Sequence, residues 1–408
     1  MHPSTPCNHF NSSYLQFAGN IDEWVRRGHS YTLEGYKHSY GEARSIWDDF
    51  VEHVLELMSE CPDYADTIKE LPDRVARWPL RGCHDLLRLK DAHLQPWLIL
   101  DHAELERLSD MLPSFSETER PYENTCYDYS AAAVALQFFA SCTKMMRSSV
   151  RKIILKENDV SVAQLECHGR GFVPICQENT SLRIERRVSL WKAVFLVSPR
   201  RHQEYIKKYI TAAESDQDSS NFQDDLLRAY TVTKSIGKWV TEAMALQSLG
   251  MPEGSHTLVL EGDSIPNHTA NVFRIVQRDA AWQAALDICY SLDVFEFNPS
   301  WLSRRLHQAF AFSGLPEMVC TLSTDSAPVR CNFPLHSPFD LDSSVQELLE
   351  RSGNLSGHNH RWRWAEDWGT RWSRHNPLEF QTEAPLPPWH MLRWRHVLQQ
   401  IPPTYLRR

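Results

Sequence analysis

Residues 150–195 have the sequence VRKIILKENDVSVAQLECHGRGFVPICQENTSLRIERRVSLWKAVF. The β-rich run around Ile153 is typical of a short strand, and from Leu182 onward apolar and charged side chains alternate as in a second strand. The apolar segment 172–176 between them indicates a helix. Parallel strands need a crossover connection of this kind. The stretch therefore predicts a strand–helix–strand unit with parallel strands.

The same alternation extends in both directions. Upstream, an apolar stripe predicts a helix over 130–147; downstream, a helix is expected over 226–249 and a third strand over 257–260. A long helix follows Asn267. Strands that alternate with helices are typical of layered proteins, so the predicted fold class is α/β (or α+β). The strand–helix period also suggests irregular stacked repeats.

Changes in composition divide the chain into five parts. They are a poorly ordered arm (1–42), a helical region (43–112), a linker (113–129), an α/β body (130–300) and a loop-rich tail (301–408). Tryptophan, arginine and proline are concentrated in the tail. Cation–π contacts between these side chains favour a tail packed on the body. The alternative is an exposed anchor for a partner, because Trp and Arg dominate binding hot spots.

Charge and composition limit the compartment and the partners. The chain has 408 residues, ten cysteines and a formal charge of −9. No secretory signal and no apolar run of membrane-spanning length are found, so a cytoplasmic or nuclear protein without a membrane partner is expected. A basic segment covers 183–208, but aromatic side chains are not interleaved for base stacking. Nucleic acid is therefore disfavoured as a partner, and acidic groups of this chain or of another protein are preferred.

The strand at 257–260 is followed by Gly262-Asp263-Ser264, which is similar to the nucleophile motif of GDS-type serine esterases. Such enzymes also need a histidine base, usually in a late Asp-x-x-His pair, and none follows Ser264. The other interpretation is a turn in which Asp263 or Ser264 makes a local hydrogen bond. We therefore assign no catalytic residue and keep Ser264 as the alternative.

Metal and nucleotide motifs are missing from the sequence. There is no Cys-x-x-Cys pair, no His-Glu-x-x-His and no calcium-loop pattern. Neither G-x-x-x-x-G-K-S/T nor G-x-G-x-x-G occurs. We therefore predict no metal site and no cofactor.

Residues 70–97, ELPDRVARWPLRGCHDLLRLKDAHLQPW, resemble a degenerate F-box. The middle is shorter than in that family, and Trp78-Pro79 falls where the family continues a helix. The resemblance implies an apolar face that docks on the adaptor subunit of a ubiquitin ligase. The residues of this face are Leu71, Pro72, Leu86, Leu87, Leu89 and Trp97.

Most of the chain, from about residue 130 to the Trp-rich tail, resembles a family of uncharacterised proteins from filamentous fungi. The resemblance is carried by 150–195, by SLGMPEGSHTLVLEGDSIPN and by VFRIVQRDAAWQAAL. It implies no assigned activity. With the F-box-like segment, it implies a non-catalytic interaction protein that serves as a substrate receptor of a ubiquitin ligase. The alternatives are a serine esterase using Ser264 and a fungal protein with a role in secondary metabolism.

Overall fold

Four short parallel strands form the central sheet of the computed structural model. They are β1 (Lys152–Glu157), β2 (Arg183–Ser189), β4 (His256–Glu261) and β5 (Val329–Cys331). Their order in the sheet, β1-β2-β4-β5, is also their order in the chain, and all three pairings are parallel. Each connection therefore adds the next strand at the same edge. The α/β fold class is confirmed, as is the parallel pairing predicted for the first two strands.

The structure describes about half of the chain. The described residues are 43–46, 48, 49, 52, 53, 56, 95–111, 128–161, 163–196, 226–292, 312, 314–322, 324, 327–352 and 378–393. Besides the four strands, the described elements are α5 (His102–Met111), α6 (Ala131–Ser141), α7 (Lys144–Ser149), η4 (Leu165–Phe172), α8 (Val173–Glu178), η5 (Leu190–Val194), β3 (Leu227–Arg228), α11 (Ala229–Ser248), α12 (Pro266–Ser291), α14 (Leu315–Thr321), α15 (Leu341–Ser352) and β6 (Glu379–Phe380). The predicted arm (1–42) and all of the linker except residues 128 and 129 lie outside them.

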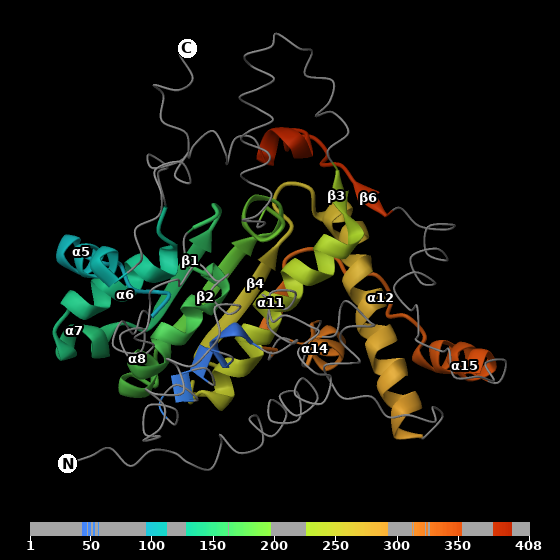
Figure 1. Cartoon of the computed structure of the whole chain (residues 1–408), viewed down its shortest axis with the longest axis horizontal. Helices are drawn as coiled ribbons and strands as arrows, with labels where there is room; N and C mark the ends of the chain where they lie inside the picture. Colours follow the sequence, from blue (N-terminus) through green and yellow to red (C-terminus); the bar gives the residue numbers. More distant parts are fainter. Residues whose placement is uncertain are drawn as a thin grey trace, which may run out of the picture.

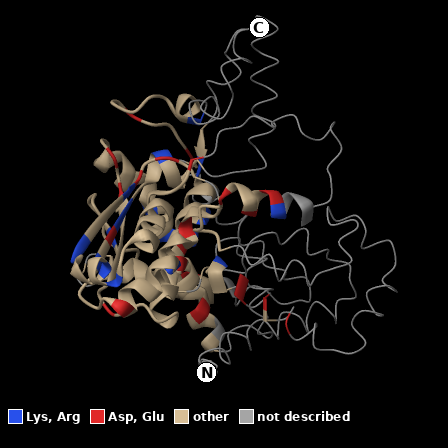
Figure 2. Ribbon diagram, turned by 90° about the vertical axis from the view of Figure 1, so that its left-hand side faces the viewer, with Lys and Arg blue, Asp and Glu red and all other residues tan. Residues whose placement is uncertain are grey.

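The sheet has one buried face and one open face. In β4, His256, Leu258 and Leu260 are buried, whereas the residues between them are only partly covered. The same period of two runs through β1 and β2. Figure 2 shows the strands as the outer layer on the left, with basic residues along them and the helices to their right. Among the described elements, the helices thus cover one face of the sheet.

Two apolar clusters lie on the buried face. The larger cluster joins β2 and β4 to α11, α12 and α14, and the smaller one joins β1 and β2 to α6, η4 and α8. Figure 1 shows α6, α7 and α8 on the β1 side of the sheet and α12 and α15 on the opposite side. Helix α15 packs on α12 through a third cluster around Trp282 and Leu348.

Two features differ from the sequence prediction. The helix expected over 130–147 is interrupted at Cys142, which has an extended backbone, and the chain restarts as α7. Thr143 causes the restart because its side chain accepts the backbone N–H of Met146 at 3.4 Å, as an N-cap does. Strand β5 was not predicted, because its three residues are too few to show an alternating pattern.

Residues near both ends of the described part of the chain make contacts with the body. Ser45 donates its backbone N–H and its hydroxyl to the Glu242 carboxylate of α11, at 2.8 and 2.7 Å. Near the C-terminus, β6 pairs antiparallel with β3. Trp389 is only 3% exposed, and its ring packs on Trp191 with the ring centroids 6.0 Å apart. Within the described ranges, no helix combines the length and apolar character needed to cross a membrane.

Candidate functional site

The open face of the sheet carries a group of charged side chains. We define it as the residues of the four strands that point away from the helices. They are Lys152, Ile154, Lys156, Arg183, Glu185, Arg187, Thr257, Val259, Glu261 and Arg330. Five of these are cations and two are carboxylates, so the formal excess is 5 − 2 = +3. The whole chain carries −9, and the open face therefore has the opposite sign to the protein as a whole.

Some of these charges neutralise one another. Glu185 lies between Lys152, at 3.1 Å, and Arg187, whose Nε donates at 2.6 Å. Arg187 also meets Glu261 at 3.3 Å. Although desolvation opposes the shift, the hydrogen bonds from Lys152 and Arg187 lower the pKa of Glu185. The centre of the face is thus an internally paired network.

Three cations of the open face have no carboxylate partner among the described residues. One is Arg183, which donates instead to the carbonyls of Thr180 and Leu182, at 2.7 and 3.0 Å. The other two are Lys156 and Arg330. Within the described part of the chain, neither Lys156 nor Arg330 makes an ion pair; Lys156 is exposed, whereas Arg330 is partly buried and its Nε atom is buried without a hydrogen-bond partner. The sheet register aligns them: Lys156 lies beside Arg187, Arg187 beside Val259, and Val259 beside Arg330. We call these four residues the cross-strand row. Three strand spacings separate its ends, which is about 14 Å.

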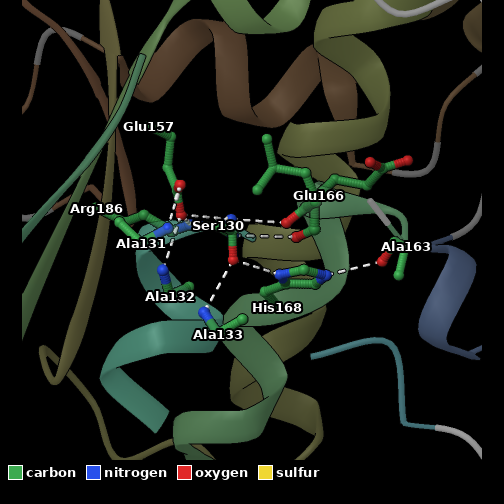
Figure 3. Close-up of polar contacts among 10 residues, drawn as sticks. Ser130, Ala131, Ala132, Ala133, Glu157, Ala163, Glu166, His168 and Arg186 are labelled. Atoms are coloured by element: carbon green, nitrogen blue, oxygen red, sulfur yellow. Dashed lines mark hydrogen bonds and ion pairs between the residues drawn. The ribbon is translucent and has the colours of Figure 1, made fainter. Parts of the chain in front are cut away.

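A buried serine–histidine pair lies on the other side of the sheet (Figure 3). Ser130 Oγ is 2.6 Å from His168 Nδ1, and His168 Nε2 is 2.7 Å from the Ala163 carbonyl. A carbonyl oxygen can only accept, so Nε2 carries the proton and Nδ1 accepts the Ser130 hydroxyl. Ala163 and Gln164 both have positive φ, at 62° and 56°, in the segment that presents this carbonyl.

Hydroxyl and imidazole at this distance have the arrangement of a nucleophile with its base. However, Ser130 is 2% exposed and His168 is 1% exposed, so bulk solvent does not reach either side chain. Ser130 also accepts the backbone N–H of Ala133 as the N-cap of α6. Burial and the charge of Arg186 lower the pKa of His168 to about 4. The pair therefore anchors the start of α6 in the core.

Beside this pair, a buried ion pair joins β1 to β2. Glu157 accepts from Arg186 Nε at 3.0 Å and from the backbone N–H groups of Ala131 and Ala132 at 2.9 and 3.2 Å (Figure 3). Arg186 Nη2 donates to the Leu165 carbonyl at 2.6 Å, and the guanidinium lies 4.7 Å from the Trp239 ring centroid. One ion pair thus connects β1, β2, α6, η4 and α11.

Ser264, the alternative nucleophile, is exposed in the turn after β4. Its neighbour Asp263 has φ 52° and accepts the Ser189 hydroxyl at 2.6 Å. Burial raises the pKa of Asp263. His268, in the first turn of α12, contacts residues 378–393 instead: its Nε2 is 2.6 Å from the Gln381 carbonyl, and its Nδ1 is 2.9 Å from Glu383 Oε1. The structure does not bring a described histidine into hydrogen-bond contact with Ser264.

We expect no covalent labelling of Ser264 by a fluorophosphonate probe, because no described base activates its hydroxyl. In-gel fluorescence of the purified full-length protein measures this directly, with a known serine esterase as the positive control. Labelling of the wild-type protein that disappears in Ser264→Ala would contradict this expectation and favour the esterase.

Of the six residues predicted to face an adaptor, only Trp97 lies within the described residues. Its ring packs on the smaller apolar cluster, and the Arg170 guanidinium lies 6.0 Å from the ring centroid. A Cβ atom at Gly171 would come within 2.6 Å of the Trp97 ring, so glycine permits this close approach. Leu71, Pro72, Leu86, Leu87 and Leu89 lie outside the described residues.

Among the described residues, no three His, Cys, Asp or Glu side chains are grouped so that they could hold a metal ion. Comparisons with protein-family models, with curated proteins and with solved structures gave no match. The open face of the sheet is therefore the candidate site that this structure offers. Sequence reasoning missed it, although the alternation of Arg183, Glu185 and Arg187 with the buried residues between them was a usable signal.

Proposed function

We propose that this chain is a non-catalytic protein–protein interaction protein that works as an F-box-like substrate receptor of a ubiquitin ligase, in the cytoplasm or nucleus. The observation that carries the proposal is the open face: a parallel sheet whose described helices lie on one side only. Sheets built from parallel strands are normally covered on both faces. A face that no described helix covers and that charged side chains line is suited to holding another protein.

The arrangement of polar groups favours binding over chemistry. On the open face, cations and carboxylates are spread over four strands. The serine–histidine pair that resembles a catalytic dyad is buried, and His268 is engaged by the C-terminal segment. A reactive centre needs a nucleophile and a base that a substrate can reach together. The described residues instead provide a broad surface.

The two halves of the proposal rest on different parts of the chain. The F-box-like segment at 70–97 supports adaptor docking by its sequence resemblance alone. The body supports target binding through the open face. Trp97 lies where these halves meet, since it ends the F-box-like segment and packs beside Arg170.

We expect the tagged full-length protein to recover a purified F-box adaptor subunit in a pull-down, because the resemblance implies an apolar docking face. The double variant Leu86→Asp/Leu87→Asp should lose the adaptor, since charges in such a face are left without partners. The matched control is Lys156→Glu/Arg330→Glu, which changes the open face and should retain the adaptor. An authentic F-box protein verifies the assay. No recovery of the adaptor by the wild-type chain under those conditions rules out the receptor.

A further inference from the structure

We propose that the open face binds an extended acidic segment of a target protein, with two carboxylates at Lys156 and Arg330 and an apolar side chain between them. This inference rests on the proposed function and gives the chemistry of the target. The charge of the open face indicates which kind of ligand it binds. The face has an excess of +3 in a chain that carries −9, so an acidic segment is attracted to this face and repelled by the rest of the protein.

The uncompensated charges of the cross-strand row define where the carboxylates go; the third uncompensated cation, Arg183, lies outside the row and donates to two backbone carbonyls. Arg187 lies between Glu185 and Glu261 and is already neutralised. Lys156 on β1 and Arg330 on β5 have no carboxylate partner among the described residues, and they stand at the two ends of the cross-strand row. A ligand with two separated carboxylates can pair with both without breaking the central network.

The spacing of the row matches an extended peptide that lies across the strands. Four residues of extended chain span about 14 Å, which equals three strand spacings. Side chains at alternate positions of such a peptide point to the same side. Carboxylates at the first and fifth positions would then reach Lys156 and Arg330. The third side chain would come down between Arg187 and Val259, which favours an apolar residue that covers Val259 and the aliphatic part of Arg187.

A nucleic acid fits the same face less well. Glu185 and Glu261 lie within it and would repel a continuous phosphate chain. The open face also has no aromatic side chain on which a base could stack. Because of these two features, the open face favours a peptide with carboxylates only at the two ends of the row over a polyanion with charges along its whole length.

The test is fluorescence polarisation with the full-length protein and a labelled five-position peptide core of aspartate, serine, leucine, serine and aspartate. We expect binding that weakens as salt is added. Lys156→Glu and Arg330→Glu should each weaken it several-fold and together by about tenfold or more. Arg183→Glu, on the same face but outside the row and outside the ion-pair network, is the matched control and should change it less. Arg330→Gln gives a milder second variant if Arg330→Glu folds poorly.

Three competitor ligands decide the outcome. A peptide with asparagine in place of aspartate, and one with the two aspartates at the first and third positions, should bind much more weakly. Equal affinity for these peptides overturns the inference, as does a single-stranded RNA that binds more tightly through the same two residues. Adaptor recovery without any peptide binding would leave the receptor function standing and reject only this inference. Peptide binding without adaptor recovery would reject the receptor function and leave this inference standing.

Discussion

Replacing Arg186 with leucine is expected to lower the free energy of unfolding by about 3–5 kcal/mol. The guanidinium and the Glu157 carboxylate are each 2% exposed, at 3.0 Å from one another. Without Arg186, the Glu157 charge stays buried with no counter-charge, and the Leu165 carbonyl loses its donor. Urea titration followed by tryptophan fluorescence measures the loss.

Arg187 provides the control because it is the next residue of β2 but points to the open face. Its ion pairs are partly exposed, so Arg187→Leu should cost no more than about 1 kcal/mol. Adding Glu157→Gln to Arg186→Leu should recover part of the stability, since the buried charge is then removed. If Arg186→Leu costs no more than Arg187→Leu, the ion pair does not hold the body together as described.

Acidification from about pH 7 to about pH 5 is expected to destabilise the fold by about 4 kcal/mol, about 2 kcal/mol from each of two buried histidines. Burial, followed by the charge of Arg186, lowers the pKa of His256 to about 3 and that of His168 to about 4, from an ordinary value of 6.5. The unfolded chain therefore binds more protons than the native one between these values. Stability is complete above pH 6.5 and is lost as the pH falls toward 4 and then 3.

His256→Leu separates the two contributions. His256 Nε2 is buried without a hydrogen-bond partner, so leucine removes the titrating group without breaking a bond. Urea unfolding at both pH values should show about half of the wild-type acid sensitivity in this variant. His102→Leu, at a side chain that is 89% exposed, is the control and should keep the wild-type slope. An unchanged slope in His256→Leu would mean that this histidine is not buried in its neutral form.

The strands that alternate cleanly could be predicted from the sequence. In β2 the period of two is carried by Ile184 and Val188, which face the helices, whereas β1 and β4 were recognised by their short β-rich runs. Strand β5 escaped prediction because three residues are too few to show a period. Its place in the sheet is fixed by pairing with β4, a contact that no local pattern contains.

The candidate site was harder to predict, because a run of basic residues says nothing about which way each one points. Arg183, Arg186 and Arg187 looked like one surface segment, yet β2 turns Arg186 into the core and the other two outward. The ion pair with Glu157 and the partners of His168 come from elements that are distant in sequence. Only the assembled sheet shows which cations remain without a partner.

The contact between Trp191 and Trp389 has a consequence for biosynthesis. Translation supplies the segment 378–393 long after the strands, so Trp191 cannot reach its final environment while the ribosome is still making the intervening chain. During that interval, apolar surface near the end of β2 is a natural target for chaperones. A premature stop codon between the end of β5 and Trp389 should therefore yield a polypeptide that is degraded or aggregates, even though it contains all four strands of the sheet.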